Sequence, residues 1–149
     1  MSGDRKPAPF LQTPFAEDSP AFSPDDKWVA YNSNASGRFE VYVRAFPGPG
    51  GQFQISRNGG WAPKWRGDGK EIFFLALDGT MMSADISSGK ELQASVPRAL
   101  FQTQLLKGQD RHVYDVTRDG TRFLIRVPDA KQITTPLTVV VNWPSLSKK

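Results

Sequence analysis

One short sequence pattern occurs three times along the chain and limits its possible folds more than any other feature. Each copy begins with an apolar residue, continues through a turn that contains an aspartate, and ends in an apolar run. The copies are residues 22–31, 65–74 and 116–125. Their aspartates, Asp25, Asp68 and Asp119, lie 43 and 51 residues apart. Repeats of this length indicate stacked copies of one supersecondary unit, each burying its apolar faces against its neighbours.

The repeated aspartate marks a tight turn between two strands. Pro24 sets the backbone angle for the first corner of a type I turn, and the aspartate side chain accepts hydrogen bonds from nearby backbone amides. The next position favours a left-handed backbone, which Gly69 and Gly120 adopt at little cost. Asp26 holds that position in the first copy and is expected to leave a slightly strained but intact turn. The predicted structural turn residues are Asp25, Asp26, Asp68, Gly69, Asp119 and Gly120.

Further short apolar runs follow each turn at regular intervals. Predicted third strands are residues 40–43, 80–85 and 138–141. Predicted outer strands are residues 10–13, 53–56 and 100–103. Short strands separated by regular turn signals are typical of all-β proteins, and no amphipathic helix of useful length is visible.

These elements predict an all-β fold, a partial β-propeller of about three four-stranded antiparallel blades plus one leading outer strand. Residues 1–149 are expected to form a single partial propeller domain. Its expected parts are an outer strand of a preceding blade at 9–13 and blades at 20–56, 62–103 and 112–143. The leading outer strand suggests that the functional unit is larger than this chain.

Composition excludes several functions. The chain has no cysteine, which excludes disulfides, thiolate metal sites and cysteine nucleophiles. Its net charge of +4 is scattered rather than gathered in a basic stripe, so nucleic acid is not an expected partner. No apolar run approaches the ~20 residues of a membrane span, and the polar start lacks the apolar centre of a signal peptide. As written, the chain is expected to be soluble.

Two sets of residues resemble known propellers. Residues 23–26, Ser-Pro-Asp-Asp, resemble the Ser-Pro-Asp-Gly turn of the TolB-type, WD-repeat-like family. Residues 36–51, 65–71 and 139–143 together resemble the C-terminal propeller end of bacterial Ser/Thr protein kinases. The resemblance implies a sensor or docking module, periplasmic if its parent is a membrane-anchored kinase or TolB-like protein and otherwise cytoplasmic. No kinase motif is present, so the resemblance carries no kinase activity onto any residue of this chain.

The sequence predicts no catalytic, metal-binding or cofactor-binding residue. His112 is the single histidine, its spacing to acidic residues assembles no metal site, and no Gly-x-Ser-x-Gly nucleophile turn occurs. We therefore expect a non-catalytic recognition module for a protein, a peptide or a small ligand. One alternative is a fragment of a propeller hydrolase or of a propeller that gates a peptidase. Another is a half-propeller that closes by homodimerisation through its open sheet edges.

The resemblance also implies where a partner would bind. In such propellers, contacts gather on loops that enter the innermost strands and on loops that join the second and third strands. The residues expected to bind there are Asn34, Arg38, Arg57, Asn58, Trp61, Lys64, Asp78, Arg111, His112 and Tyr114. Lys64 and Tyr114 are expected on innermost strands, lining the channel. Among the tryptophans, Trp28, Trp65 and Trp143 are expected to pack between blades and Trp61 to be partly exposed.

Overall fold

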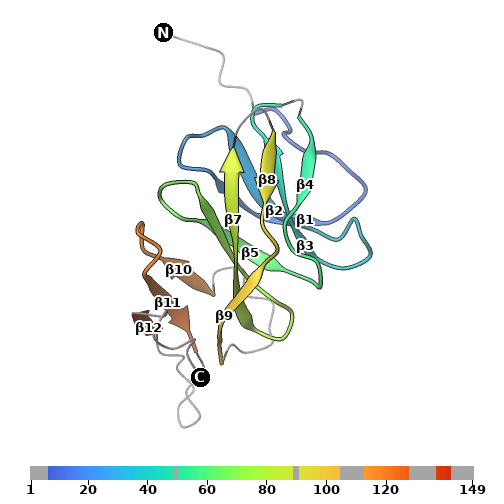
Figure 1. Ribbon diagram of the computed structural model, residues 1–149. Helices are drawn as coiled ribbons and strands as arrows, with labels where there is room; N and C mark the ends of the chain where they lie inside the picture. Colours follow the sequence, from blue (N-terminus) through green and yellow to red (C-terminus); the bar gives the residue numbers. More distant parts are fainter. Residues whose placement is uncertain (1–6, 49, 89–90, 105–112, 128–136, 142–149) are drawn as a thin grey trace.

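The computed structural model describes residues 7–48, 50–88, 91–104, 113–127 and 137–141 of the chain. These residues form strands and turns but no helix, and hence none long and apolar enough to cross a membrane. Three antiparallel sheets follow one another from the N-terminal to the C-terminal part of the chain (Figure 1).

The first and third sheets are simple meanders. The first has the order β1 (Glu17–Phe22), β2 (Trp28–Ser33), β3 (Glu40–Ala45) and β4 (Gln52–Gln54). The third has the order β10 (Tyr114–Val116), β11 (Arg122–Arg126) and β12 (Leu137–Val141) in the part of the chain that the structure describes. The predicted third strands at 40–43 and 138–141 lie within β3 and β12.

The second sheet has an outer edge made of two short strands. Its path is β5 (Trp61–Trp65), β6 (Glu71–Leu75), β7 (Thr80–Ser88) and β8 (Leu92–Ala94). The first half of β7 pairs instead with β9 (Arg98–Gln102). Because β7 is nine residues long, it has room for both partners. The sequence analysis placed an outer strand at 100–103 but missed β8.

The leading outer strand predicted at 9–13 is not a strand. Phe10 and Leu11 instead pack their side chains on the face of the first sheet that points away from the second. Pro9 and Pro14 bracket this segment and have no amide hydrogen to donate to a sheet edge, which disfavours strand pairing. The first sheet therefore begins at Glu17.

Alternation of side chains along the middle strands creates two cores, one between each pair of neighbouring sheets. Along β6, Ile72 and Phe74 point to the first sheet, whereas Phe73 and Leu75 point to the third, and all four are buried. The core between the first two sheets contains Ala30, Val41, Val43, Ile55, Ile72, Phe74, Ala84, Ile86 and Leu92. The core between the last two contains Ala62, Phe73, Leu75, Met81, Leu100, Val113, Tyr114, Phe123 and Ile125. The second sheet is thus the middle layer of the stack.

Hydrogen bonds between sheets fix the stacking. The Trp65 indole Nε1 donates to the Ala21 carbonyl at 3.1 Å, which joins the first strands of two sheets. The Ala62 amide donates to Asn32 Oδ1 at 2.9 Å, and its carbonyl accepts the Tyr114 hydroxyl at 2.8 Å. Bonds of this kind cannot slide as apolar contacts can, so they hold the three sheets in one arrangement.

Candidate functional site

The three aspartate turns share one geometry and lie at the same end of their strands. The first residue of each turn donates its backbone N–H to the carbonyl five residues later, at 2.8 to 2.9 Å. These first residues are Ser23, Arg66 and Thr117. The residue after each aspartate has a positive φ, 58° at Asp26, 72° at Gly69 and 73° at Gly120. Asp26 thus adopts the left-handed backbone that the other two copies give to glycine.

Each turn aspartate is fully engaged within its own turn. Asp25 accepts the Ser23 hydroxyl at 2.6 Å, and Asp119 accepts the Thr117 hydroxyl at 2.5 Å. Asp68 accepts both Nε and an Nη of Arg66, each at 2.8 Å. Every aspartate also accepts the backbone N–H two residues on, at 3.0 to 3.2 Å.

These hydrogen bonds lower the pKa of the three carboxyl groups, because bonds donated to a carboxylate favour its charged form. The Arg66 guanidinium lowers the pKa of Asp68 to about 2. The Thr117 hydroxyl is the largest cause of the lowering of the Asp119 pKa, also to about 2. The Ser23 hydroxyl lowers the pKa of Asp25. All three aspartates are therefore ionised near neutral pH.

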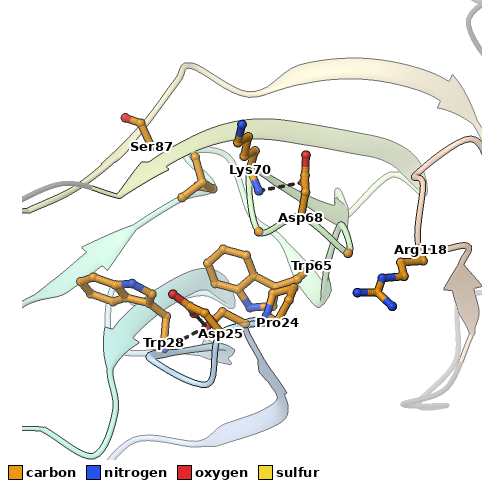
Figure 2. A pocket seen from close by; sticks show the side chains of 12 residues that line it. Pro24, Asp25, Trp28, Trp65, Asp68, Lys70, Ser87 and Arg118 are labelled. Carbon is orange, nitrogen blue, oxygen red and sulfur yellow. Dashed lines mark hydrogen bonds between the residues drawn. The ribbon is translucent and has the colours of Figure 1, made fainter.

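The turns surround a pocket of about 450 Å³, which we call the turn-face pocket (Figure 2). The indoles of Trp28 and Trp65 form its apolar wall, and both indoles also pack against the core between the first two sheets. Figure 2 shows the Arg118 guanidinium directed from the third sheet toward Trp65 and Pro24. The lining residues are Ser23, Pro24, Asp25, Trp28, Trp65, Gly67, Asp68, Gly69, Lys70, Ile86, Ser87 and Arg118.

The pocket is lined by two carboxylates and two cations, and only the carboxylates have charged partners among the described residues. Asp68 is paired with Arg66, and the Asp25 carboxylate lies 3.9 Å from Lys27 Nζ. The side chains of Lys70 and Arg118 have neither a hydrogen bond nor an ion pair with any described residue. Two cations therefore remain beside two indoles, and each can pair with an anionic group of a ligand.

The opposite ends of the strands form a second surface, which we call the loop face. It consists of the loops 34–39, 55–60 and 76–79, which contain half of the predicted binding residues. Asn34 accepts the Ala16 amide through Oδ1 at 2.9 Å and thereby closes the start of β1. Asp78 accepts the Thr80 amide at 2.9 Å, which lowers its pKa. Both side chains support the loops themselves.

Arg38 and Glu40 form the most tightly bound group of the loop face. Glu40 is only 1% exposed, and its carboxylate accepts Arg38 Nε at 2.7 Å, the Gly59 amide at 2.9 Å and the Ser56 hydroxyl. Arg38 also donates to the Arg57 carbonyl at 2.7 Å. The structure thus joins the predicted residues Arg38 and Arg57 by a direct bond to the Arg57 backbone. Arg38 is also held by a buried carboxylate, Glu40, that the sequence did not single out.

The remaining predicted residues have varied environments. Tyr114 does not line an open channel, because it is buried and its hydroxyl bonds to Ala62; burial raises its pKa well above the usual value. Lys64 lies 3.6 Å from Asp115 in an exposed ion pair. Trp61 is half-buried against the second core. Arg57 and Asn58 are exposed. Arg111, His112 and Trp143 lie outside the described residues.

The sequence analysis missed the turn-face pocket. A signal was present, because Lys70 and Arg118 lie two residues after and one residue before turn aspartates. Adjacency in sequence does not show which cation pairs with a turn aspartate: Arg66 pairs with Asp68, and the Lys70 side chain has no partner among the described residues. Within the described part of the chain, no three His, Asp or Glu side chains gather as a metal site would require.

Known proteins resemble this chain in fold but not closely in sequence. No protein-family model matches it, and no curated protein sequence does. Solved structures match well: TolB from Acinetobacter baumannii shares 15% identity at a TM-score of 0.61, over 85% of this chain and 30% of that one. A TolB candidate from Agrobacterium tumefaciens shares 15% identity at a TM-score of 0.58, and the match covers 88% of this chain and 47% of that one. A chain of the nidogen/laminin complex shares 17% identity at a TM-score of 0.60, and the match covers 89% of this chain and 47% of that one.

The chain therefore spans less than half the length of each of these structures. Each match covers at least 85% of this chain and therefore includes most of its three stacked antiparallel sheets. The chain is an all-β, partial β-propeller, similar in fold to TolB and other propeller proteins.

Proposed function

We propose that this chain is a non-catalytic recognition module whose binding site is the turn-face pocket. One observation carries the proposal: Lys70 and Arg118 line a 450 Å³ pocket beside two indoles and have no partner among the described residues. Ligand sites combine apolar walls with a few polar groups that are free to bind. Here the cations lie on turns and the two indoles at the adjoining ends of β2 and β5, all anchored by a stack of three sheets.

Support for a site without catalysis comes from the same geometry. The acids of the pocket are held in their ionised forms by turn hydrogen bonds and are not poised to exchange protons near neutral pH. Hydrolysis of ester, lactone or peptide substrates by the full chain would contradict this part of the proposal.

The module would act within a larger propeller. Two observations support this. The chain spans only 30% and 47% of the length of the two TolB structures. Its sequence also resembles propellers that follow bacterial Ser/Thr kinases. In that setting it would act as a sensor for a protein, peptide or small ligand, outside the inner membrane if its parent is membrane-anchored. Sequencing the DNA that flanks the coding region tests this directly: further propeller blades in the same reading frame would support it.

The recognition role is tested by a ligand screen on the full chain, read by thermal shift and by tryptophan fluorescence. We expect ligands that raise the melting temperature to lose their effect when Trp28 is replaced by Phe. This change keeps an apolar group in the wall but alters its shape, and it leaves the Trp65–Ala21 hydrogen bond between the sheets intact. Phe101→Leu provides a control because Phe101 packs in the core between the second and third sheets. A screen and an affinity pulldown that both return nothing would contradict the proposal.

A second candidate function is self-assembly, favoured by the outer face of the first sheet. Phe22 and Phe46 pack edge to face there, at 4.9 Å between ring centroids, yet remain 54% and 38% exposed. Val29 and Tyr31 on this face correspond in the repeat to Ile72 and Phe74, which bury against a neighbouring sheet. Because Val29 and Tyr31 are already buried with Phe10 and Leu11 packed against them, a second copy would contact Phe22 and Phe46. Light scattering decides: a monodisperse dimer supports assembly, and a clean monomer contradicts it.

A further inference from the structure

We infer that the ligand of the turn-face pocket is an acidic peptide, one that carries carboxylates next to aromatic or apolar side chains. This inference rests on the proposed recognition function and specifies its ligand. It follows from the charges, the walls and the position of the pocket relative to the three sheets.

The charges select an anion. Arg66 is occupied by Asp68 and Glu71, with the Glu71 contact at 2.6 Å, so it adds little to the field felt by a ligand. Lys70 and Arg118 remain, both exposed and without a partner among the described residues. Carboxylates bound by such cations form charge-assisted hydrogen bonds, which are roughly twice as strong as neutral ones.

The walls select more than a point charge. Trp28, Trp65, Pro24 and Ile86 give the pocket an apolar lining that a small inorganic anion would leave unused. Aromatic side chains of a ligand stack on indoles, and such pairs contribute beyond simple burial of area. A ligand that fits both features carries negative charge and an apolar or aromatic group together.

The position of the cations favours a ligand that extends across the sheets. Lys70 belongs to the turn of the second sheet and Arg118 to the turn of the third, whereas Trp28 belongs to the first (Figure 2). An extended peptide can contact all three turns at once, with carboxylates at the two cations and a ring between the indoles. A compact ligand would contact fewer of them.

Gly67 holds the third-sheet turn in this position. Its amide donates to the Arg118 carbonyl at 2.8 Å, and a Cβ at residue 67 would lie 2.7 Å from that oxygen and clash with the Arg118 side chain. The lack of a side chain at residue 67 therefore allows Arg118 to reach the pocket. Gly67 is a positioning residue for peptide binding.

The test uses the full chain and a blocked octapeptide of alternating Glu and Phe, with binding measured by calorimetry and by tryptophan fluorescence. Lys70→Gln and Arg118→Gln are each expected to weaken binding about tenfold, because each removes one charge-assisted bond. Arg57→Gln is the matched control: it removes the same charge from the loop face and should leave affinity unchanged. Added salt should weaken binding, because it screens exposed charges.

Three further results would overturn the inference. If the same peptide with Gln in place of Glu binds as tightly, charge does not select the ligand, although the recognition function stands. If inorganic phosphate competes fully with the peptide, the site binds point anions. If the peptide fails to bind a chain that is folded by circular dichroism, the acidic-peptide inference is wrong, and the ligand screen alone then decides the recognition function.

Discussion

The two ends of the sheets use their polar side chains in opposite ways. At the loop face, Arg38, Asn34 and Asp78 are bound to Glu40 or to backbone groups, and their loops differ in length from one sheet to the next. At the turn face, the three turns share one geometry, and groups within each turn donate hydrogen bonds to its aspartate. The side chains of Lys70 and Arg118 have no partner among the described residues.

The turn face shows that a regular element can leave charged side chains available for binding. A short turn satisfies its amides with a single aspartate, so neighbouring side chains are not needed for structure. A longer loop has more backbone groups to satisfy and takes side chains for that purpose. Variable loops are the usual place to seek a binding site. Among the described residues the loop face keeps an exposed cation, Arg57, whereas the repeated turns place two cations, Lys70 and Arg118, in a pocket that also has two indoles.

The largest expected effect tests the structural role of the loop face. Glu40→Ala should lower the free energy of unfolding by ~3 kcal/mol, because three donors lose their buried acceptor. Urea denaturation of the full chain measures it. Asp78→Ala is the control, an exposed acid that serves only its own turn and should have a much smaller effect. Equal unfolding midpoints for Glu40→Ala and the parent chain would show that the loop face does not depend on this carboxylate.

The next effect tests the contact between turns. Gly67→Ala should cost ~2 kcal/mol, because the new Cβ must displace Arg118. Gly37→Ala, on the loop face, meets nothing within 4 Å but must hold a φ of 91°, so it should cost ~1 kcal/mol from backbone strain alone. Peptide affinity separates the two further: it should fall in Gly67→Ala and stay constant in Gly37→Ala.

A smaller effect concerns acid stability. The folded pKa values of Asp68 and Asp119, about 2, lie below the unfolded value near ~3.9. Their contribution to stability is therefore complete above about pH 4 and is lost as the pH falls toward about 2. Solvent exposure limits its size. Asp68→Asn with Asp119→Asn should flatten the dependence of the melting temperature on pH in this range, and an unchanged slope would contradict the turn geometry.

The smallest effect concerns the first turn. Asp26→Gly should stabilise the chain by ~0.5 kcal/mol, because glycine relieves the left-handed backbone at φ 58°. The reverse change at the second turn, Gly69→Asp, has room for a Cβ and should destabilise by a similar amount. If both variants shift stability in the same direction, left-handed strain is not what distinguishes the turns.

The sequence was sufficient to predict the repeat and its turns. The aspartate spacing and the alternation around residues 40–43 and 80–85 report local geometry, which sequence carries directly. The segment 9–13 was misjudged because Phe10 and Leu11 suit either an outer strand or packing on a sheet face. The two flanking prolines, Pro9 and Pro14, already disfavour a strand, and the tertiary contacts of Phe10 and Leu11 decide between the two outcomes.

The site was less predictable because its defining property is which charges lack partners. In sequence, Lys70 and Arg118 look like any cation next to a turn. Lys70 is available to bind a ligand because Arg66, and not Lys70, donates its side-chain hydrogen bonds to Asp68. Arg38 looked free for binding, but it is bound to Glu40, whose burial depends on the packing of β3 against β5 and the loop before it. Pairings of this kind arise only from the folded arrangement.

The most direct test of the account is to map peptide binding on the backbone amides of the full chain by NMR. The account predicts that the Glu/Phe octapeptide shifts the amide signals of Gly67, Gly69 and Lys70, and that Arg118→Gln diminishes those shifts. It predicts little change at Gly59 and Gly60 on the loop face. Shifts concentrated at Gly59 and Gly60, with Gly67 and Gly69 unmoved, would contradict the claim that the turn face carries recognition.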